Sequence, residues 1–190
     1  AGKAGLTGLE FAGGIPGTVG GAVFMNAGAH GSDVSRVLTH AEVLYETGEL
    51  KTFSNAEMGF KYRTSRVQHE SGLIIAAVFQ LERGDRQAIA QKMAEYKLRR
   101  KTTQPLNLHC AGSVFRNPPG DYAARLIEAC GLKGYRIGGA KVSDMHANFI
   151  VNIDDASASD VRCLIRTIQE KVAEQFSVHL VPEVEMIGEE

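Results

Sequence analysis

The sequence predicts an α+β fold, in which helices and strands are mixed along the chain without a regular strand–helix alternation. Apolar residues alternate in several short segments typical of strands, and a long amphipathic stripe near the C-terminus is typical of a helix. The third observation is a glycine-rich start, where ten of the 21 glycines fall within the first 31 residues. A chain of 190 residues is long enough for one large domain or two small ones.

The first element is the glycine-rich segment 13–22, which is followed by Met25-Asn26-Ala27-Gly28. Glycine lets a backbone adopt a positive φ or lie against a ligand, and Pro16 fixes one φ. A surface turn or flexible linker is the alternative, but here the glycines alternate with apolar residues such as Ile15 and Val19. The composition therefore predicts a buried loop that faces a ligand. The segment has neither the Lys of a P-loop nor the preceding strand of a Rossmann fingerprint.

A hairpin and a further strand are predicted next. Strands over 37–46 and 49–53 are joined by Thr47-Gly48, a short turn signal. Ser54-Asn55-Ala56-Glu57 has the capping-box pattern, which predicts a short helix beginning there. Residues 73–81 predict a strand that is buried on at least one face.

A helix capped by Asp85 is predicted to follow, with Ile89, Met93 and Tyr96 at helical spacing. Its end is basic, as the helix dipole favours, so these charges indicate a solvated terminus or, alternatively, an anion contact. Residues 102–108 contain a proline and no strong periodicity, and we interpret them as a domain boundary.

The second half predicts short strands around two helices. The predicted elements are a strand or turn over 113–115, a helix over 121–129 that Gly131 stops, strands over 137–142 and 148–153, a helix over 159–175, and a closing strand over 178–187. The later helix buries one stripe, formed by Val161, Leu164, Ile165, Ile168, Val172 and Phe176.

Composition excludes several classes of protein. A net charge of −1 gives no general attraction to nucleic acid or to an anionic membrane. No apolar run approaches the roughly 20 residues that span a bilayer. The three cysteines, Cys110, Cys130 and Cys163, form no disulfide framework; we expect small buried side chains in a reducing cytoplasm. The histidines show no metal-ligand spacing, so no metal site is inferred.

Three places carry candidate polar chemistry. Ser113 follows a glycine and precedes Asn117-Pro118-Pro119, so its hydroxyl is held in a fixed segment, although a structural turn is the alternative. Arg63 lies in an irregular loop, where its guanidinium can bind a carboxylate or phosphate or can simply be solvated. Glu183 and Glu185 would share one face of the last strand, which a solvent-facing edge also explains. The residues alone do not distinguish these readings.

Taken in order, the segments resemble the family of UDP-N-acetylenolpyruvoylglucosamine reductases, flavoenzymes of peptidoglycan precursor synthesis also called MurB. The matching segments keep the family's order and run through nearly the whole chain. They are 8–21, 25–29, 60–65, 112–118, 126–128 with 131–134, 146–152 and 182–188. One such motif would be weak, whereas the ordered set is specific.

The resemblance implies a fold and a reaction. Residues 1–104 resemble the later part of a vanillyl-alcohol-oxidase-type FAD-binding domain, and residues 105–190 resemble the family's C-terminal substrate domain, in the shorter type II form. In the family, NADPH reduces FAD, and the flavin then reduces UDP-N-acetylglucosamine enolpyruvate to UDP-N-acetylmuramate. The implied enzyme is an NADPH-dependent UDP-N-acetylmuramate dehydrogenase of the cytoplasm.

The resemblance also implies site residues, position by position. The catalytic residues would be Arg63 at the developing carboxylate charge, Ser113 as proton donor and Glu183 as an acid beside the enolate. The substrate-binding residues would be Tyr62, Arg63, Gln104, Asn117 and His146, with Gln104 standing where some members carry a Lys. The FAD-binding residues would be Gly13, Gly14, Ile15, Pro16, Gly17, Thr18, Gly20, Gly21 and Asn26.

One departure from the family concerns the flavin pyrophosphate. The family holds it with a segment upstream of the glycine-rich loop, and nothing in residues 1–12 matches that segment. We therefore expect an N-terminally truncated chain with half a flavin site, a colourless purified protein, and self-association through uncovered apolar surface. The alternative is a sugar-nucleotide-binding module of the same fold without catalysis.

Overall fold

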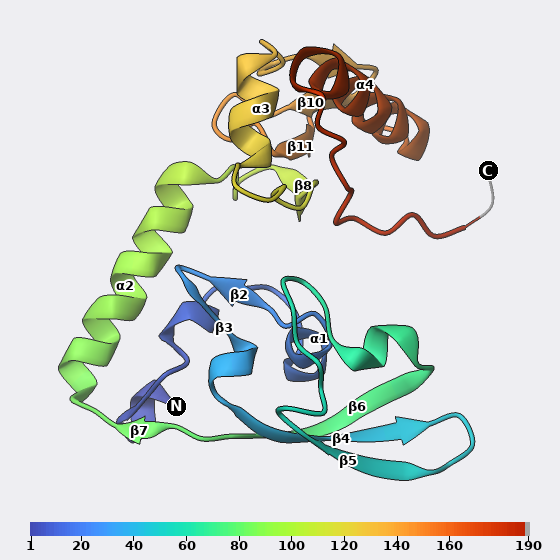
Figure 1. Ribbon diagram of the computed structural model, residues 1–190. Coiled ribbons are helices and arrows are strands. Elements are labelled where there is room, and N and C mark those ends of the chain that lie inside the picture. The colour runs from blue at the N-terminus through green and yellow to red at the C-terminus, as the bar shows by residue number, and fades with distance from the viewer. Residues whose placement is uncertain (189–190) are drawn as a thin grey trace. The chain divides into compact units, whose positions relative to one another are not determined.

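The computed structural model describes residues 1–188, and their backbone is drawn in Figure 1. The chain divides into two compact units, Ala1–Arg99 and Arg100–Glu190, and each is described by itself. Both units mix helices with antiparallel strands, which confirms the predicted α+β class. Within residues 1–188, none of the helices is long and apolar enough to cross a membrane.

A three-stranded antiparallel sheet forms the centre of the first unit. Strand β4 (Leu38–Tyr45) lies between β5 (Leu50–Ser54) and β6 (Gly72–Phe79). The β4–β5 turn contains Gly48 at φ 82°, as a tight hairpin turn requires, so the predicted hairpin is confirmed. The strand predicted over 73–81 is also confirmed, with one face packed against the core and the other exposed.

A short helix, α1 (Val19–Phe24), lies against β6 and was not predicted. A methyl group at Gly20 would lie 3.0 Å from the carbonyl oxygen of Ile74, so glycine permits this close approach. The remaining short elements of the unit are η1 (Gly2–Ala4), β1 (Leu6–Thr7) paired with β7 (Glu82–Arg83), η2 (Glu10–Ala12), β2 (Gly28–Ala29) paired with β3 (Ser32–Asp33), η3 (Val34–Arg36) and η4 (Arg66–His69).

The capping-box prediction at residues 54–57 is wrong about the helix. Ser54 N donates to Glu57 Oε2 at 2.8 Å, and Glu57 N donates to Ser54 Oγ at 3.4 Å, so both bonds of the box are present. The chain nevertheless makes only a turn, because Gly59 at φ 57° redirects the backbone before a second helical turn can form.

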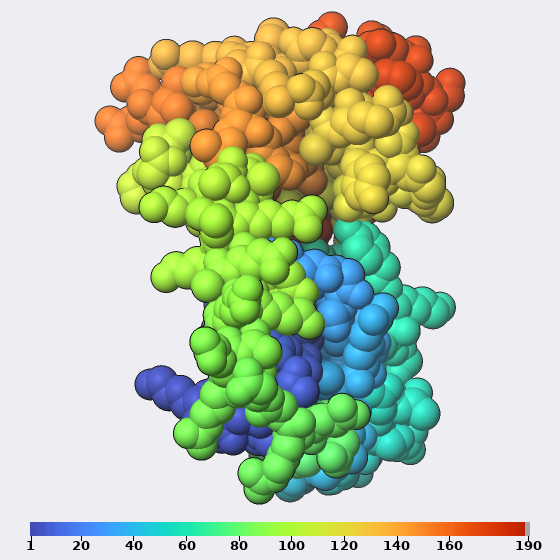
Figure 2. Space-filling view, turned by 90° about the vertical axis from the view of Figure 1, so that its left-hand side faces the viewer, coloured from blue at the N-terminus to red at the C-terminus, as the bar shows by residue number. Residues whose placement is uncertain are grey.

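The predicted helix after Asp85 is confirmed as α2 (Arg86–Thr103), in which Ala88 N donates to Asp85 Oδ2 at 2.8 Å. Ile89 is its buried residue, and most of the helix lies at the surface, as Figure 2 shows on the face turned to the viewer. Its last residues belong to the second unit.

The second unit is built on a four-stranded antiparallel sheet in the order β8 (His109–Ser113), β11 (Phe149–Asn152), β10 (Ala140–Val142) and β9 (Arg136–Ile137). Helices α3 (Ala123–Ala129) and α4 (Ala158–Phe176) pack with it around one apolar core. The predicted stripe of α4 is confirmed: Leu164, Ile165, Ile168 and Val172 are buried, and Val161 and Phe176 pack against the core from its edge.

Three predictions for this unit are corrected. The strand expected over 137–142 is two strands, because the chain turns at Gly138-Gly139. The strand expected over 178–187 is absent among residues 1–188; Pro182 has no N–H, and the segment makes one isolated bridge to Phe115. Glu183 and Glu185 therefore do not share a strand face. Two of the cysteines expected to be buried, Cys110 and Cys163, are exposed, and Cys130 is half-buried.

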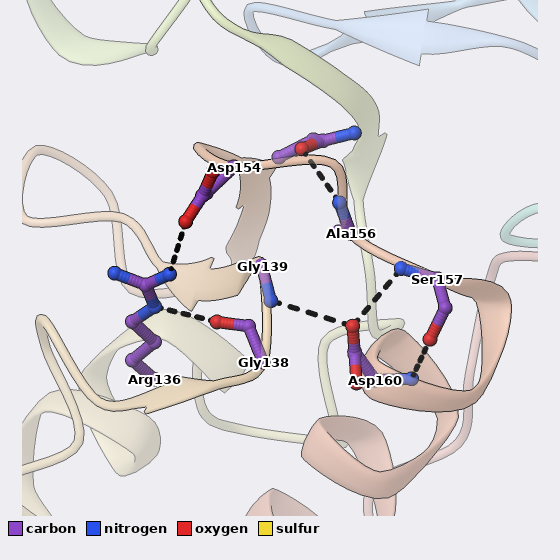
Figure 3. A network of polar contacts seen from close by, with 8 residues as sticks. Arg136, Gly138, Gly139, Asp154, Ala156, Ser157 and Asp160 are labelled. Carbon is purple, nitrogen blue, oxygen red and sulfur yellow. Dashed lines mark hydrogen bonds and ion pairs between the residues drawn. The ribbon is translucent and has the colours of Figure 1, made fainter.

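The start of α4 is fixed by a network of polar contacts around Asp160 (Figure 3). Ser157 and Asp160 form a capping box, and Asp160 also accepts a hydrogen bond from Gly139 N at 3.3 Å. A methyl group at Gly139 would lie 2.1 Å from the carbonyl oxygen of Asp154, so only glycine fits in this turn. The helix is thereby joined to the β9–β10 turn.

Candidate functional site

The glycine-rich segment of the first unit presents bare backbone at the surface. Gly14 and Gly17 have φ 97° and 136°, and a methyl group at Gly17 would meet no atom within 4 Å. Thr18 Oγ1 accepts a hydrogen bond from Gly21 N at 3.0 Å and so caps α1. The expected buried loop is corrected: Gly14, Pro16, Gly17, Thr18 and Val19 are exposed, because this stretch has few side chains to bury.

Two further glycines of this segment serve packing. Gly13 lies close to Glu10 and Met93, where a methyl group would be 3.1 Å from the Glu10 carbonyl oxygen. Gly20 faces β6, as described above, and Ile15 packs on the core from its edge. The open part of the loop is therefore limited to the residues around Gly17.

Asn26 connects the glycine-rich segment with the loop that carries Arg63. Its side chain is 4% exposed, accepts a hydrogen bond from Ser35 N at 2.9 Å and donates one to the Lys61 carbonyl oxygen at 3.0 Å. Both ends of the amide are thus engaged within the protein. The residue positions its neighbours, and a ligand contact from the same amide group would compete with these bonds.

Arg63 is held in an unusual conformation beside this connection. Its φ is 53°, its Nη1 donates to the Gly28 carbonyl oxygen at 3.2 Å, and its own carbonyl oxygen accepts from Gln68 Nε2 at 3.2 Å. The guanidinium lies over the Tyr62 ring, 5.2 Å from the centroid, and that ring is 52% exposed. A non-glycine residue at positive φ is costly, so the surrounding contacts fix this cation in place.

The segments that carry Ser113 and Glu183, 70 positions apart in sequence, are brought together in the second unit. Ser113 ends β8 and pairs with Phe149, directly after Gly112 at φ 84°. Glu183 N donates to the carbonyl oxygen of Val114, the next residue along, at 2.7 Å. A hydroxyl and a carboxyl group are therefore carried by adjacent segments joined by backbone hydrogen bonds.

Asn148 is a buried polar residue that the sequence did not single out. It is 4% exposed and lies in the turn before β11. Its Oδ1 accepts from Phe115 N at 2.9 Å, and its Nδ2 donates to the Phe115 carbonyl oxygen at 2.8 Å. A lone Asn in a turn has no periodic signal, so only its place in the matched segment 146–152 could have indicated it.

His146 lies two residues before Asn148 and is half-buried. Burial lowers the pKa of its imidazole, and the charge on Lys133 adds to this effect. Its Nδ1 accepts from Asn148 N at 3.2 Å, so the neutral ring carries its hydrogen on Nε2. The ring also packs edge-on against Phe149, with centroids 4.8 Å apart.

The two remaining candidates of the second unit differ in their surroundings. Asn117 is exposed, and its Oδ1 accepts from Ala123 N at 3.0 Å, so it caps the start of α3. Gln104 lies just after α2, and its buried Oε1 has no hydrogen-bond partner among residues 1–188.

The candidate residues are divided between the two units. Arg63 and Tyr62 lie in the first unit, and the second unit contains Ser113, Glu183, His146, Asn117 and Gln104.

The comparisons with known proteins define the class first. Residues 1–54 match the domain described as "FAD binding domain", which places the glycine-rich segment in a flavoprotein. Residues 104–187 match the domain described as "UDP-N-acetylenolpyruvoylglucosamine reductase, C-terminal domain". A protein of that name from Bacillus licheniformis is 54% identical over 182 residues, which are 95% of this chain and 99% of the relative. The chain belongs to the UDP-N-acetylenolpyruvoylglucosamine reductase family.

Other relatives are longer than this chain. The reductase of the same name from Bacillus pumilus is 54% identical over 189 residues, which are 99% of this chain and 62% of the relative. The crystal structure of the reductase (MurB) from Thermus caldophilus superimposes with a TM-score of 0.85 at 40% identity, covering 97% of this chain and 66% of that chain. The chain thus spans about three fifths of the length of several curated relatives.

Proposed function

We propose that this chain carries the substrate domain and residues of the flavin site of an enzyme that reduces UDP-N-acetylglucosamine enolpyruvate to UDP-N-acetylmuramate with NADPH. The observation that supports it best is the pairing of the segments that carry Ser113 and Glu183, through the hydrogen bond from Glu183 N to the Val114 carbonyl oxygen. That pairing lies within the domain named for these reductases. The reaction needs a proton donor and an acid close together, and the adjacency of these two segments supports Ser113 and Glu183 in those roles.

The glycine-rich loop suits part of a flavin site. Positive φ at Gly14 and Gly17 and the open space at Gly17 leave backbone that a flat group can approach, and the loop lies within the matched FAD-binding domain. We assign this contact to residues 13–18, with Asn26 holding the neighbouring loop in place. FAD would supply the hydride that reduces the double bond, and NADPH would be the external reductant.

The residues of the chain would stabilise charge and move a proton. Hydride addition to an alkene conjugated with a carboxylate places negative charge on that carboxylate. The Arg63 guanidinium would bind this charge, and Glu183 would assist the enolate as an acid. The Ser113 hydroxyl would then transfer its proton to the adjacent carbon, completing the reduction.

The decisive experiment is Ser113→Ala in protein supplied with FAD, with the Bacillus pumilus relative as the positive control for the assay. We expect product formation to fall by about 10²- to 10⁴-fold, the usual contribution of a general acid. Reduction of the flavin by NADPH should continue, because the hydroxyl acts only after it. Product at the wild-type rate would contradict the proton-donor role.

A matched pair tests the acid. Glu183→Gln should lower product formation by about 10²-fold, because it removes the acid while keeping the shape. Glu185→Gln makes the same change two residues away on an exposed side chain and should leave the rate unchanged. Equal losses in the two variants would show that the segment matters only for folding.

We place the enzyme in the cytoplasm, where exposed thiols such as Cys110 stay reduced.

A further inference from the structure

The buried amide of Asn148 is the feature of the second unit that the proposed reaction does not yet use. We propose that Asn148 is a positioning residue that holds residues 114–116 and thereby sets the place of Ser113 relative to Glu183. We call the hydrogen bonds between Asn148 and residues 114–116 the tether. The effect of the tether on catalysis rests on the proposed function, whereas the tether itself is a property of the second unit.

One edge of the segment 114–116 is bound to Asn148. Val114 N donates to the Asn148 carbonyl oxygen at 2.9 Å. The side-chain amide forms a pair of hydrogen bonds with Phe115, at 2.9 Å to its N–H and 2.8 Å to its carbonyl oxygen. The side chain thus takes the place of a neighbouring strand just before β11 begins at Phe149, and Phe115 itself is 1% exposed.

The other edge of the same segment is bound to the chain around Pro182. Glu183 N donates to the Val114 carbonyl oxygen at 2.7 Å, and Arg116 N donates to the Val181 carbonyl oxygen at 2.9 Å. Val114 is therefore bonded from both sides, to Asn148 through its N–H and to Glu183 through its carbonyl. If the segment is no longer held by Asn148, it can shift against the chain around Pro182, which changes the place of Ser113 relative to Glu183.

The neutral amide is the group that this place requires. A buried carbonyl and a buried N–H of one residue need a donor and an acceptor side by side, which Asn supplies and Asp or Leu does not. The backbone of Asn148 is fixed in turn, since its N–H donates to His146 Nδ1 at 3.2 Å. Loss of the amide leaves both polar groups of Phe115 unpaired in the interior.

The tether is tested by amide hydrogen exchange in the complete chain. In Asn148→Ala we expect the N–H groups of Glu183 and Arg116 to exchange at least about tenfold faster than in the wild type. The N–H groups of Ile165 and Ile168 in α4 should keep their protection. Asn148→Ser, which leaves room for a bridging water, provides the same measurement if Asn148→Ala does not fold.

Asn152→Ala is the matched control, since Asn152 lies at the other end of β11 and its Oδ1 accepts from the nearby Ala156 N, at 3.0 Å. It should leave exchange at Glu183 and Arg116 unchanged. Unchanged exchange in the Asn148 variants, or an equal rise throughout the second unit, would overturn the tether.

Kinetics then separate the tether from the proposed reaction. In protein loaded with FAD, Asn148→Ser should lower kcat for product by about tenfold or more while KM and flavin reduction by NADPH stay near wild type. A wild-type protein that reduces no enolpyruvyl substrate contradicts the proposed function, and hydrogen exchange still decides the tether. A wild-type protein that turns over, with an Asn148→Ser variant equally fast, contradicts the positioning role.

Discussion

The central sheets of the two units differ in how their faces are covered. In the second unit, β10 and β11 are almost fully buried, because α3 and α4 close an apolar core with them. In the first unit, Leu50, Leu44 and Leu73 lie side by side across the three strands and are 53%, 37% and 65% exposed. The helix α1 packs against β6, yet these side chains stay in solvent.

Because of this difference, the candidate site residues of the two units are held in place in different ways. Ser113 ends a strand of a sheet that has its own helical cover, and Asn148 lies in the turn before another strand of it, so their geometry depends on a core within one unit. The glycine-rich loop lies in the unit whose sheet leaves one face exposed, where fewer buried contacts hold the elements. We therefore expect equal substitutions in the two sheets to have unequal effects.

The largest expected effect comes from truncating a matched pair of isoleucines. Ile168 in α4 is 1% exposed and Ile75 in β6 is 50% exposed. Ile168→Ala should cost about 2–5 kcal/mol in the second unit, whereas Ile75→Ala should cost about 0.5 kcal/mol or less in the first. Hydrogen exchange of peptides from each unit measures both, since the units need not unfold together. Similar losses in the free energy of unfolding for the two variants would contradict the expected difference between the two sheets.

An intermediate effect is expected at the start of α4. Asp160→Ala removes acceptors for Ser157 N and Gly139 N, so the midpoint of thermal unfolding of the second unit should fall by about 4–8 °C. Asp85→Ala, which removes the cap of α2, is the matched change in the first unit and loses the bond to Ala88 N. A larger fall for Asp85→Ala would contradict the ranking.

The same carboxylate gives a pH test. The N–H groups of Ser157 and Gly139 and the Ser157 hydroxyl lower the pKa of Asp160 below its usual value near 4. The folded form therefore binds its proton less readily than the unfolded form, and the stabilisation is present above the usual pKa. It is lost as the pH falls through the lowered pKa. Asp160→Ala should lose less stability than the wild type over that acid range, and an identical pH profile would contradict the assignment.

The smallest effect on stability, and a clear one on association, is expected at Leu73. Leu73→Lys places a charge on the open face of β6 and should change the free energy of unfolding by less than about 0.5 kcal/mol. It should weaken the self-association that the open face favours, as measured by sedimentation velocity over a range of concentrations. Leu106→Lys makes the same change of charge at a residue that is 53% exposed outside this sheet. If Leu73→Lys and Leu106→Lys weaken self-association equally, the loss comes from the added charge and not from the exposed face of β6.

Periodic patterns predicted most of the regular structure. The α4 stripe, the hairpin around Gly48 and the helix after Asp85 are confirmed because local sequence sets both their period and their ends. The failures arose where a glycine at positive φ or a proline interrupts the pattern, as Gly59 and Pro182 do. Ser54 and Glu57 form their capping bonds without a helix, and the segment around Pro182 pairs at a single bridge.

In the candidate site, too, the sequence indicated some residues, and only the fold showed how they are connected. The resemblance selected Ser113 and Glu183, and the fold joins their segments through Val114, a contact that no local pattern contains. It also selected Asn26 for the cofactor, whereas the fold turns both ends of that amide toward Ser35 and Lys61. Asn148 was missed as an individual residue because one polar residue in a turn carries no period.

The sequence by itself determined the α+β class, the glycine-rich loop, the amphipathic helices and the family, because these depend on residue order and short-range spacing. Tertiary structure alone decided which buried polar groups pair between segments that are far apart in sequence. Asn148 and Asn26 have the same side chain and the same 4% exposure, yet they join different segments in different units. The physical reason is that a buried amide must satisfy its donor and acceptor with whatever backbone the fold brings to it.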